Sequence, residues 1–215
     1  MSTGGKKIAV IGAGPAGYTA AQELSKNGYT VDIYDKEDRL GGAIYTGIPE
    51  YRMSKIFLDK VFASMKEDKN ITFHFNTKID CERFEGLRKN YDKVLVATGA
   101  QIENTYGFEP GNGLYAGLTL LYDLNIRGNH EYYKKYKKAM VWGGGNVAMD
   151  CARSLVRIID DVSVVYRRSE EEITANKSEI RDARNENVKF NFLCNVKRVL
   201  RDESGAVTGA QLIRQ

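Results

Sequence analysis

The beginning of the chain constrains its fold most strongly, because a short apolar run there passes directly into a glycine-rich turn. Ile8-Ala-Val-Ile11 has the character of a buried parallel strand, and Gly12, Gly14 and Gly17 follow it at once. An alanine-rich run with helical spacing comes next and stops at Asn27-Gly28. This order predicts a nucleotide-binding unit built on a parallel sheet.

The spacing of the three glycines has a chemical reason. Gly12 makes the tight turn, Gly14 lets the backbone approach a pyrophosphate, and Gly17 lets the helix pack closely on the strand. The phosphates would then lie at the N-terminus of the helix, where free N–H groups and the helix dipole favour negative charge.

A second strand supplies the acidic residue that such a unit needs. Val31-Asp-Ile-Tyr-Asp35 reads as a strand, and Asp35 lies 23 residues after Gly12, where a carboxylate can bind ribose hydroxyls. The alternative is an accidental glycine-rich turn. Because the strand, glycines, helix, second strand and acidic residue occur in the order and at the spacing of a dinucleotide-binding unit, the sequence favours a dinucleotide site.

The same order of features returns later in the chain. A strand over Ala139–Trp142 leads into Gly143–Ala148, a turn in which alanine takes the third glycine position. The strand after the following helix ends in Arg167 and Arg168, where the first unit has Asp35. Paired guanidiniums suit the 2′-phosphate of NADP, and the alternative is a solvated basic pair at a strand end. Two such units, the first with an acid and the second with arginines, indicate FAD and NADPH.

Hydrophobic spacing predicts further elements between and after these two units. Phe57, Val61 and Met65 are expected to form the core face of a helix. The strand that ends in Thr98-Gly99 places its carboxyl end beside the first turn, where an open α/β sheet binds its ligand. The other expected elements are helices at residues 118–124 and 178–187, and strands at 71–75, 188–193, 196–201 and 206–213, the last two joined by a turn at 202–205.

Composition narrows the class of protein. The net charge of +4 is spread along the 215 residues and does not indicate a nucleic-acid surface. The run Tyr132–Lys138 mixes basic and aromatic residues, which would suit RNA, but a solvated linker is the preferred interpretation.

The cysteines and the N-terminal residues indicate the cellular compartment in which the protein is expected. Cys81, Cys151 and Cys194 form no CxxC pair, so the sequence predicts neither an iron–sulfur site nor a redox disulfide, and each cysteine is expected to be a small buried hydrophobe. The N-terminal residues are polar, so neither a signal peptide nor a membrane-spanning run is expected. A cytoplasmic protein is expected.

A family resemblance follows from the order of six motifs. The motifs are Gly12–Gly17, Arg39–Gly42, Gly47–Arg52, Ala97–Gly99, Gly143–Asp150 and Tyr166–Arg168. With these motifs in this order, the chain resembles the glutamate synthase small-subunit family of FAD- and NAD(P)H-dependent oxidoreductases, whose relatives include the flavin arm of dihydropyrimidine dehydrogenase and NAD(P)H–ferredoxin oxidoreductase subunits.

The resemblance implies an α/β protein with two Rossmann-like units, the first for FAD and the second for NADPH. It places an FAD domain at residues 1–105, a crossover at 106–138 and part of an NAD(P)H domain at 139–215. The family also has an N-terminal iron–sulfur domain and a late Gly-Asp strand that returns to the FAD domain. This sequence shows neither, so both units are expected to be incomplete at the carboxyl end.

Residue by residue, the resemblance implies two sets of cofactor contacts and no catalytic side chain or metal ligand. Asp35 stands where relatives usually have Glu. The FAD contacts are Gly12, Gly14, Pro15, Ala16, Gly17, Asp35, Lys36, Gly41, Gly42, Arg52 and Thr98, and the NADPH contacts are Gly143, Gly145, Asn146, Val147, Arg167 and Arg168.

The resulting hypothesis is a flavoprotein oxidoreductase subunit. It would transfer a hydride from NADPH to FAD and pass electrons to an electron-accepting or iron–sulfur partner subunit, with no role for nucleic acid or a membrane and with oligomer formation left open. The alternative is a nucleotide-binding or assembly module without turnover of its own. A disulfide reductase is disfavoured because the chain has no CxxC.

Overall fold

The computed structural model describes residues 5–215, and the expectation of a polar start to the chain lies partly outside these residues. The chain divides into two compact units, of which the first ends at Ile102 and the second begins at Glu103. Each unit is described by itself.

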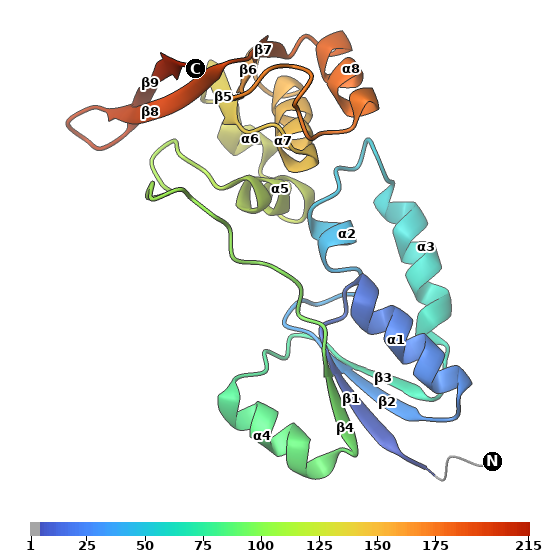
Figure 1. Ribbon diagram of the computed structural model, residues 1–215. Coiled ribbons are helices and arrows are strands. Elements are labelled where there is room, and N and C mark those ends of the chain that lie inside the picture. The colour runs from blue at the N-terminus through green and yellow to red at the C-terminus, as the bar shows by residue number, and fades with distance from the viewer. Residues whose placement is uncertain (1–4) are drawn as a thin grey trace. The chain divides into compact units, whose positions relative to one another are not determined.

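The first unit is built on a four-stranded parallel sheet in the order β3-β2-β1-β4. Helices α1 and α3 lie on one face and α4 on the other (Figure 1). The strands are β1 (Lys7–Ile11), β2 (Thr30–Tyr34), β3 (Ile71–His74) and β4 (Lys93–Val96), and the helices are α1 (Pro15–Lys26), α2 (Ala43–Thr46), α3 (Lys55–Lys66) and α4 (Cys81–Asn90). The expected parallel α/β fold is therefore confirmed.

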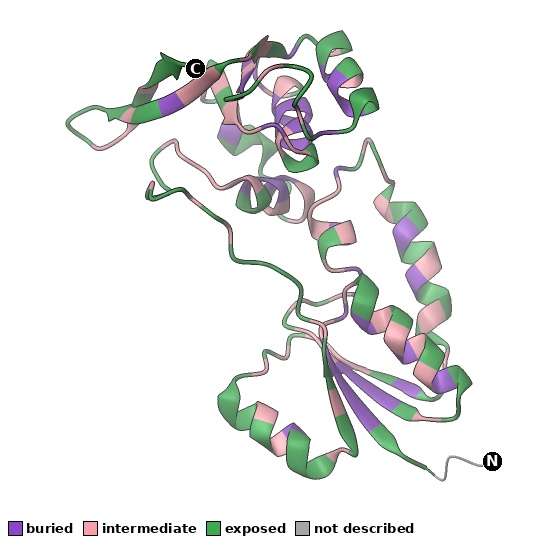
Figure 2. Ribbon diagram, viewed as in Figure 1, coloured by how far each residue is buried: buried purple, intermediate pink, exposed green. Residues whose placement is uncertain are grey.

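Side chains of β1 alternate between the two faces of this sheet. Val10 faces α1, because a Cβ atom built on Gly17 would lie 3.3 Å from Val10 Cγ1. Ala9 and Ile11 point the other way and form a cluster with Leu87 of α4. Burial on both faces explains why β1 is an almost continuous apolar run and why it is buried along most of its length (Figure 2).

Two expectations for this unit are wrong. Helix α3 forms, but it buries Leu58 and Phe62, and Phe57 is 58% exposed. The apolar face is therefore rotated by one residue from the expected stripe, because the Phe62 ring packs against Tyr18, with ring centroids 5.7 Å apart. Cys81, expected to be buried, is exposed at the first residue of α4.

A polar network lies on the face of the sheet that α4 covers. Asp32 is buried in the middle of β2, and its carboxylate accepts hydrogen bonds from His74 Nε2 at 2.9 Å and Tyr91 Oη at 2.8 Å and pairs with Lys7 Nζ at 2.8 Å. The His74 ring also stacks on Tyr34, with centroids 4.5 Å apart. Burial alone would raise the pKa of Asp32, but these three partners outweigh it and hold the pKa below its ordinary value.

We predict that Asp32→Asn destabilises the chain by about 1 kcal/mol at neutral pH, because the amide keeps one acceptor but loses the charge that Lys7 pairs with. A carboxyl group with a lowered folded-state pKa contributes stability above its unfolded value, near 3.9, which is lost as pH falls through the folded value. Urea unfolding at pH 7 and at stepwise lower pH measures both effects. The wild type and Asp32→Asn curves should converge in acid, and a constant difference would contradict the assignment.

The second unit has a three-stranded parallel sheet in the order β5-β6-β7 and a separate antiparallel hairpin. Its core is centred on Leu121, Met149 and Val162, so α5, α7 and β6 pack together. The elements are α5 (Gly117–Asn125), α6 (His130–Tyr133), β5 (Lys138–Trp142), α7 (Asn146–Val156), β6 (Asp161–Val165), α8 (Lys177–Asn185), β7 (Lys189–Asn191), β8 (Cys194–Arg201) and β9 (Val207–Arg214). The hairpin turn at 202–205 is confirmed.

The Tyr132–Lys138 run is not wholly a solvated linker. Tyr133 belongs to α6, is buried, and donates a 2.9 Å hydrogen bond from its hydroxyl to Asp123 of α5. Tyr133 and Tyr136 therefore pack in the core, while Tyr132, Lys134 and Lys135 are exposed. Among residues 5–215, no helix has the length and apolar character that crossing a membrane requires.

Candidate functional site

The first glycine turn follows β1 and lies at the carboxyl edge of its sheet. Gly12 N donates a 2.8 Å hydrogen bond to Tyr34 O at the end of β2. A Cβ atom on Gly12 would lie 2.3 Å from Ala97 O, just past the end of β4, and its φ is +108°. Only glycine fits there, and the contact brings Thr98 beside the turn.

The second loop of this site is Gly41-Gly42. Gly41 N donates a 2.9 Å hydrogen bond to Ala13 O, and a Cβ atom on Gly42 would lie 2.8 Å from Gly14 Cα. Gly14 itself has open space, because the nearest atom to a Cβ there is Gly42 Cα at 3.8 Å. The loops therefore form a tight backbone cradle that leaves Gly14 accessible to a ligand.

Helix α1 starts in this cradle, with Gly14 as its N-cap and no capping side chain. Pro15 has no N–H, and the N–H groups of Ala16 and Gly17 lie in the first turn, which has no intrahelical acceptors. Pro15 and Ala16 are exposed, whereas Gly17 is buried against Gly12 O. This end of α1 is suited to bind an anion, and Gly17 serves the packing.

Asp35 directly follows β2 and is tied to the turn. Its Oδ2 accepts a hydrogen bond from Ala13 N at 2.6 Å, and its Oδ1 accepts one from Glu37 N at 2.8 Å. A carboxylate has about four lone-pair sites, so each oxygen keeps capacity for a ribose hydroxyl. The turn thereby holds the carboxylate in place.

The remaining expected FAD contacts lie around this cradle. Lys36 is exposed, with Nζ 3.9 Å from Glu37 Oε1. Arg52 is exposed in the loop before α3, where its N–H closes a turn on Pro49 O at 3.0 Å. Of the expected FAD contacts, Gly12, Gly14, Asp35, Gly41 and Gly42 thus lie together at the first turn. Thr98 lies beside Gly12, and Arg52 lies on a separate loop.

Lys55 was not anticipated from the sequence. Its Nζ donates hydrogen bonds to Tyr45 O at 2.7 Å and Ile48 O at 2.6 Å, so it connects α2 and the loop after α2 to the start of α3. Burial lowers the pKa of this ammonium group. Both acceptors are main-chain carbonyls, which no sequence pattern marks.

The second glycine turn repeats the geometry of the first. Gly143 N donates a 3.0 Å hydrogen bond to Val165 O, and its φ is +151°. Gly145 is the N-cap of α7, again without a capping side chain, and Asn146 and Val147 are exposed in the first turn. This helix end is therefore also suited to bind an anion.

Comparison of the two turns shows that the position equivalent to Asp35 lies one residue before Arg167, where the sequence analysis expected it. Gly12 bonds to Tyr34 O and Gly143 to Val165 O, so the residue equivalent to Asp35 is Tyr166 and not Arg167. A Cβ atom on Gly144 would lie 2.5 Å from the Tyr166 ring, so an aromatic ring supports the second turn where a carboxylate supports the first. Counting 23 residues from Gly143, as from Gly12, would have identified Tyr166.

Arg167 and Arg168 extend beyond this position on an ordered backbone. Leu193 N donates to Arg168 O at 3.0 Å, and Cys194 N donates to Tyr166 O at 3.1 Å. Both arginine side chains are exposed, and within residues 5–215 neither guanidinium makes a hydrogen bond or ion pair. Their charge is thus available to an anionic ligand.

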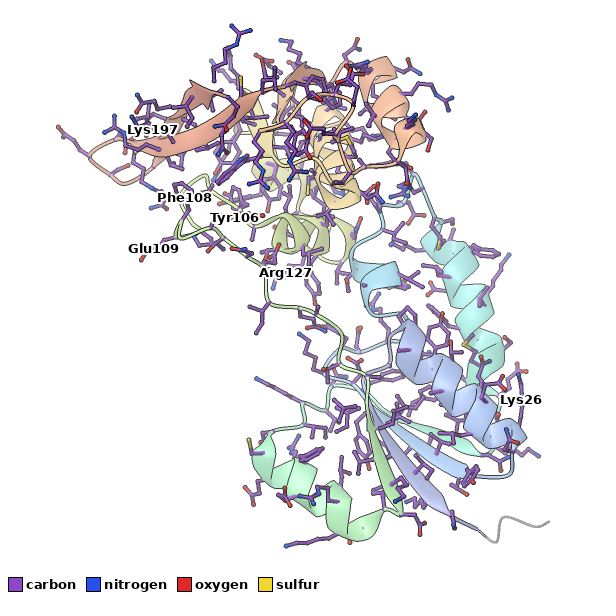
Figure 3. The ribbon with its side chains drawn as sticks, viewed as in Figure 1. Lys26, Tyr106, Phe108, Glu109, Arg127 and Lys197 are labelled. Atoms are coloured by element: carbon purple, nitrogen blue, oxygen red, sulfur yellow. The ribbon has the colours of Figure 1, made fainter. Side chains whose placement is uncertain are left out.

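Aromatic rings surround the residue that precedes the second turn. Tyr106 and Phe108 come from the segment before α5 (Figure 3), and their ring centroids lie 5.2 Å and 5.5 Å from that of Trp142. Trp142 Nε1 also donates a 3.0 Å hydrogen bond to Asn195 Oδ1. These contacts fix the end of β5, from which Gly143 departs.

Comparison with curated proteins supports the resemblance that the motifs indicate. The chain is 38% identical to the NADP(+)-dependent formate dehydrogenase subunit beta of Moorella thermoacetica, over 99% of this chain and 30% of that protein. It is 32% identical to the glutamate synthase [NADPH] small chain of Escherichia coli (strain K12), over 98% of this chain and 47% of that protein. The chain therefore spans less than half the length of these relatives, and its likeness to the glutamate synthase small chain is confirmed.

Solved structures agree on the fold. FprA of Mycobacterium tuberculosis in complex with NADPH superposes with a TM-score of 0.76 at 19% identity, over 98% of this chain and 69% of that one. Thioredoxin reductase of T. acidophilum gives 0.66 at 17% identity, over 97% and 74%. The profile of the pyridine nucleotide-disulphide oxidoreductase family matches residues 6–213. The chain belongs to the pyridine nucleotide-disulphide oxidoreductase family.

Proposed function

We propose that this chain is the dinucleotide-binding part of an NADPH-dependent flavoprotein oxidoreductase subunit. Residues 1–105 bind FAD, residues 139–215 bind NADPH, and residues 106–138 connect them. Support comes from the family match and from two glycine turns that each end at an uncapped helix N-terminus. A redox disulfide is not proposed, because Cys81, Cys151 and Cys194 are widely spaced and form no CxxC pair.

The residues of the first turn fit the pyrophosphate and ribose of FAD. Gly14 leaves space for phosphates next to the first-turn N–H groups of α1, and Asp35 offers carboxylate oxygens to ribose hydroxyls. The residues of the second turn fit a second pyrophosphate at α7, with Arg167 and Arg168 for the 2′-phosphate. When bound, the flavin and nicotinamide supply the hydride chemistry. The chain binds and orients them and needs no acid, base or nucleophile of its own.

The observation that carries this proposal is the exposed arginine pair beside the second turn. Two guanidiniums without a partner among the described residues stand on a backbone that the strand end holds in place. Such a pair matches a phosphate dianion in charge and in donor geometry.

The partner is proposed from the relatives. The proteins of Moorella thermoacetica and Escherichia coli are named as a subunit beta and a small chain, and both names specify NADP(+) or NADPH. We infer a cytoplasmic subunit that passes electrons to a partner carrying an iron–sulfur cluster or a second flavin, without nucleic acid or a membrane. Synthesis of glutamate is one of several activities among the relatives, and the alternative of a nucleotide-binding module without turnover remains the second candidate.

Titration of the full chain with FAD, NADPH and NADH, each followed by calorimetry, tests the proposal. We expect FAD binding and a preference for NADPH over NADH. Reduction of bound flavin by NADPH, seen as bleaching of the yellow absorbance, would distinguish the oxidoreductase from the binding module. A chain that is folded by circular dichroism but binds none of the three nucleotides would overturn both assignments.

A further inference from the structure

A short segment between β6 and α8 crosses the second glycine turn, and the role of this segment is not explained by the fold alone. We call residues 172–176 the strap. Gly144 O accepts three hydrogen bonds from it, from Thr174 N at 3.1 Å, Ala175 N at 2.8 Å and Thr174 Oγ1 at 3.1 Å. A carbonyl oxygen has two lone pairs, so this acceptor is fully used.

Both ends of the strap are held. Tyr166 Oη donates a 3.0 Å hydrogen bond to Glu172 O, and Asn146 Oδ1 accepts one from Asn176 N at 2.9 Å. Helix α8, which begins after Asn176, is joined to α7 by the buried Arg153, which pairs with Glu179 at 2.6 Å. The strap is therefore a fixed bridge and not a loose loop.

The first unit shows the same device at the equivalent carbonyl. Ala13 occupies in the first turn the place of Gly144 in the second, and Ala13 O accepts a 2.9 Å hydrogen bond from Gly41 N. In each unit the segment after the second strand returns to hold the same peptide group. The recurrence in two unrelated stretches of sequence indicates that the orientation of this peptide matters to the turn.

The geometry of the peptide bond says what the strap controls. A trans peptide is planar, and its C=O and N–H point in opposite directions. The Gly144 carbonyl points at the strap, so the Gly145 N–H points away from it, as part of the uncapped N-terminus of α7. We propose that Thr174 is a positioning residue that holds the Gly144–Gly145 peptide with its N–H directed to the pyrophosphate of the dinucleotide. This proposal rests on the proposed NADPH site.

The test separates the pyrophosphate from the 2′-phosphate. Thr174→Val keeps the shape of the side chain and removes its hydroxyl donor, and Thr174→Ser keeps the donor as the matched control. NADPH and NADH share the pyrophosphate, whereas 2′-AMP lacks it. Loss of one hydrogen bond in Thr174→Val is expected to weaken the binding of NADPH and of NADH equally, by roughly threefold to tenfold. The affinity of this variant for 2′-AMP should not change, and Thr174→Ser should bind all three nucleotides as the wild type does.

A second readout needs no nucleotide. The Ala175 amide, which donates to Gly144 O, should show a lower hydrogen-exchange protection factor in unliganded Thr174→Val than in wild type or Thr174→Ser, and Tyr166→Phe, which loses the bond to Glu172 O, should act in the same direction. If the wild type binds no nucleotide, the proposed function fails and exchange alone decides the role of Thr174. Unchanged exchange, or an equal loss of 2′-AMP affinity, would overturn the positioning role.

Discussion

Gly14→Val should abolish flavin retention while the chain stays folded. The Gly14 backbone has φ −76°, which any residue adopts, and the nearest atom to a Cβ there lies 3.8 Å away. The fold therefore accepts valine, but the new side chain fills the space beside the first-turn N–H groups of α1. Since hydrogen bonds to a charged group are worth about 1.5–3 kcal/mol each, losing the pyrophosphate contacts should weaken FAD by roughly a hundredfold or more.

Two control variants make this result specific. Gly86→Val places the same side chain in α4 of the same unit, where a Cβ meets nothing within 4 Å, and should leave FAD affinity unchanged. Gly17→Ala should instead destabilise the unit, because its Cβ would lie 1.8 Å from Gly12 O. Flavin absorbance after purification, FAD titration and thermal melts measure all three variants. Flavin content equal to wild type in a folded Gly14→Val chain would remove the first turn from the FAD site.

The contrast between Gly14 and Gly17 shows how much of the site the sequence could predict. The spacing of the glycines correctly predicts the tight turn at Gly12 and the close packing at Gly17, because the local path of a strand, turn and helix sets both. The pyrophosphate contact at Gly14 stays a prediction. Asp35 was found for the same reason, since the length of one strand–helix–strand unit places it at the turn. These features depend on residues that are close together in the sequence, so the spacing of residue types is enough to predict them.

Long-range contacts account for what the sequence did not predict. The face of α3 is set by Phe62, which packs on Tyr18 some forty residues earlier. The exposed Phe57 and the buried Leu58 differ by one position, a shift of about 100° around a helix, which a short apolar stripe cannot resolve. Likewise, the side chains of Thr174 and Lys55 donate to main-chain carbonyls of other segments, and no side-chain pattern in the sequence predicts such acceptors.

Replacing either Arg167 or Arg168 with alanine should weaken the binding of NADPH far more than the binding of NADH, if these arginines hold the 2′-phosphate as proposed. Both side chains are exposed, and Leu193 N and Cys194 N hold the neighbouring main chain, so truncation leaves the local backbone in place. A charge-assisted hydrogen bond to phosphate contributes about 1.5–3 kcal/mol. At about 1.4 kcal/mol per decade, each variant should bind NADPH roughly tenfold to a hundredfold more weakly, with little change for NADH.

A surface arginine elsewhere in the unit controls for the change in net charge. Arg181 lies on α8 with an exposed side chain, 3.6 Å from Asp182, and Arg181→Ala removes the same charge without touching the strand end. Titrations of wild type and the three variants with both nucleotides at fixed ionic strength give the comparison. The Arg181→Ala chain should keep the wild-type preference, because a loss that came from net charge alone would be small and shared by both nucleotides. If the Arg167→Ala and Arg168→Ala variants lose NADPH and NADH equally, or if wild type prefers NADH, the two arginines form only a solvated basic pair and the second unit is not an NADP site.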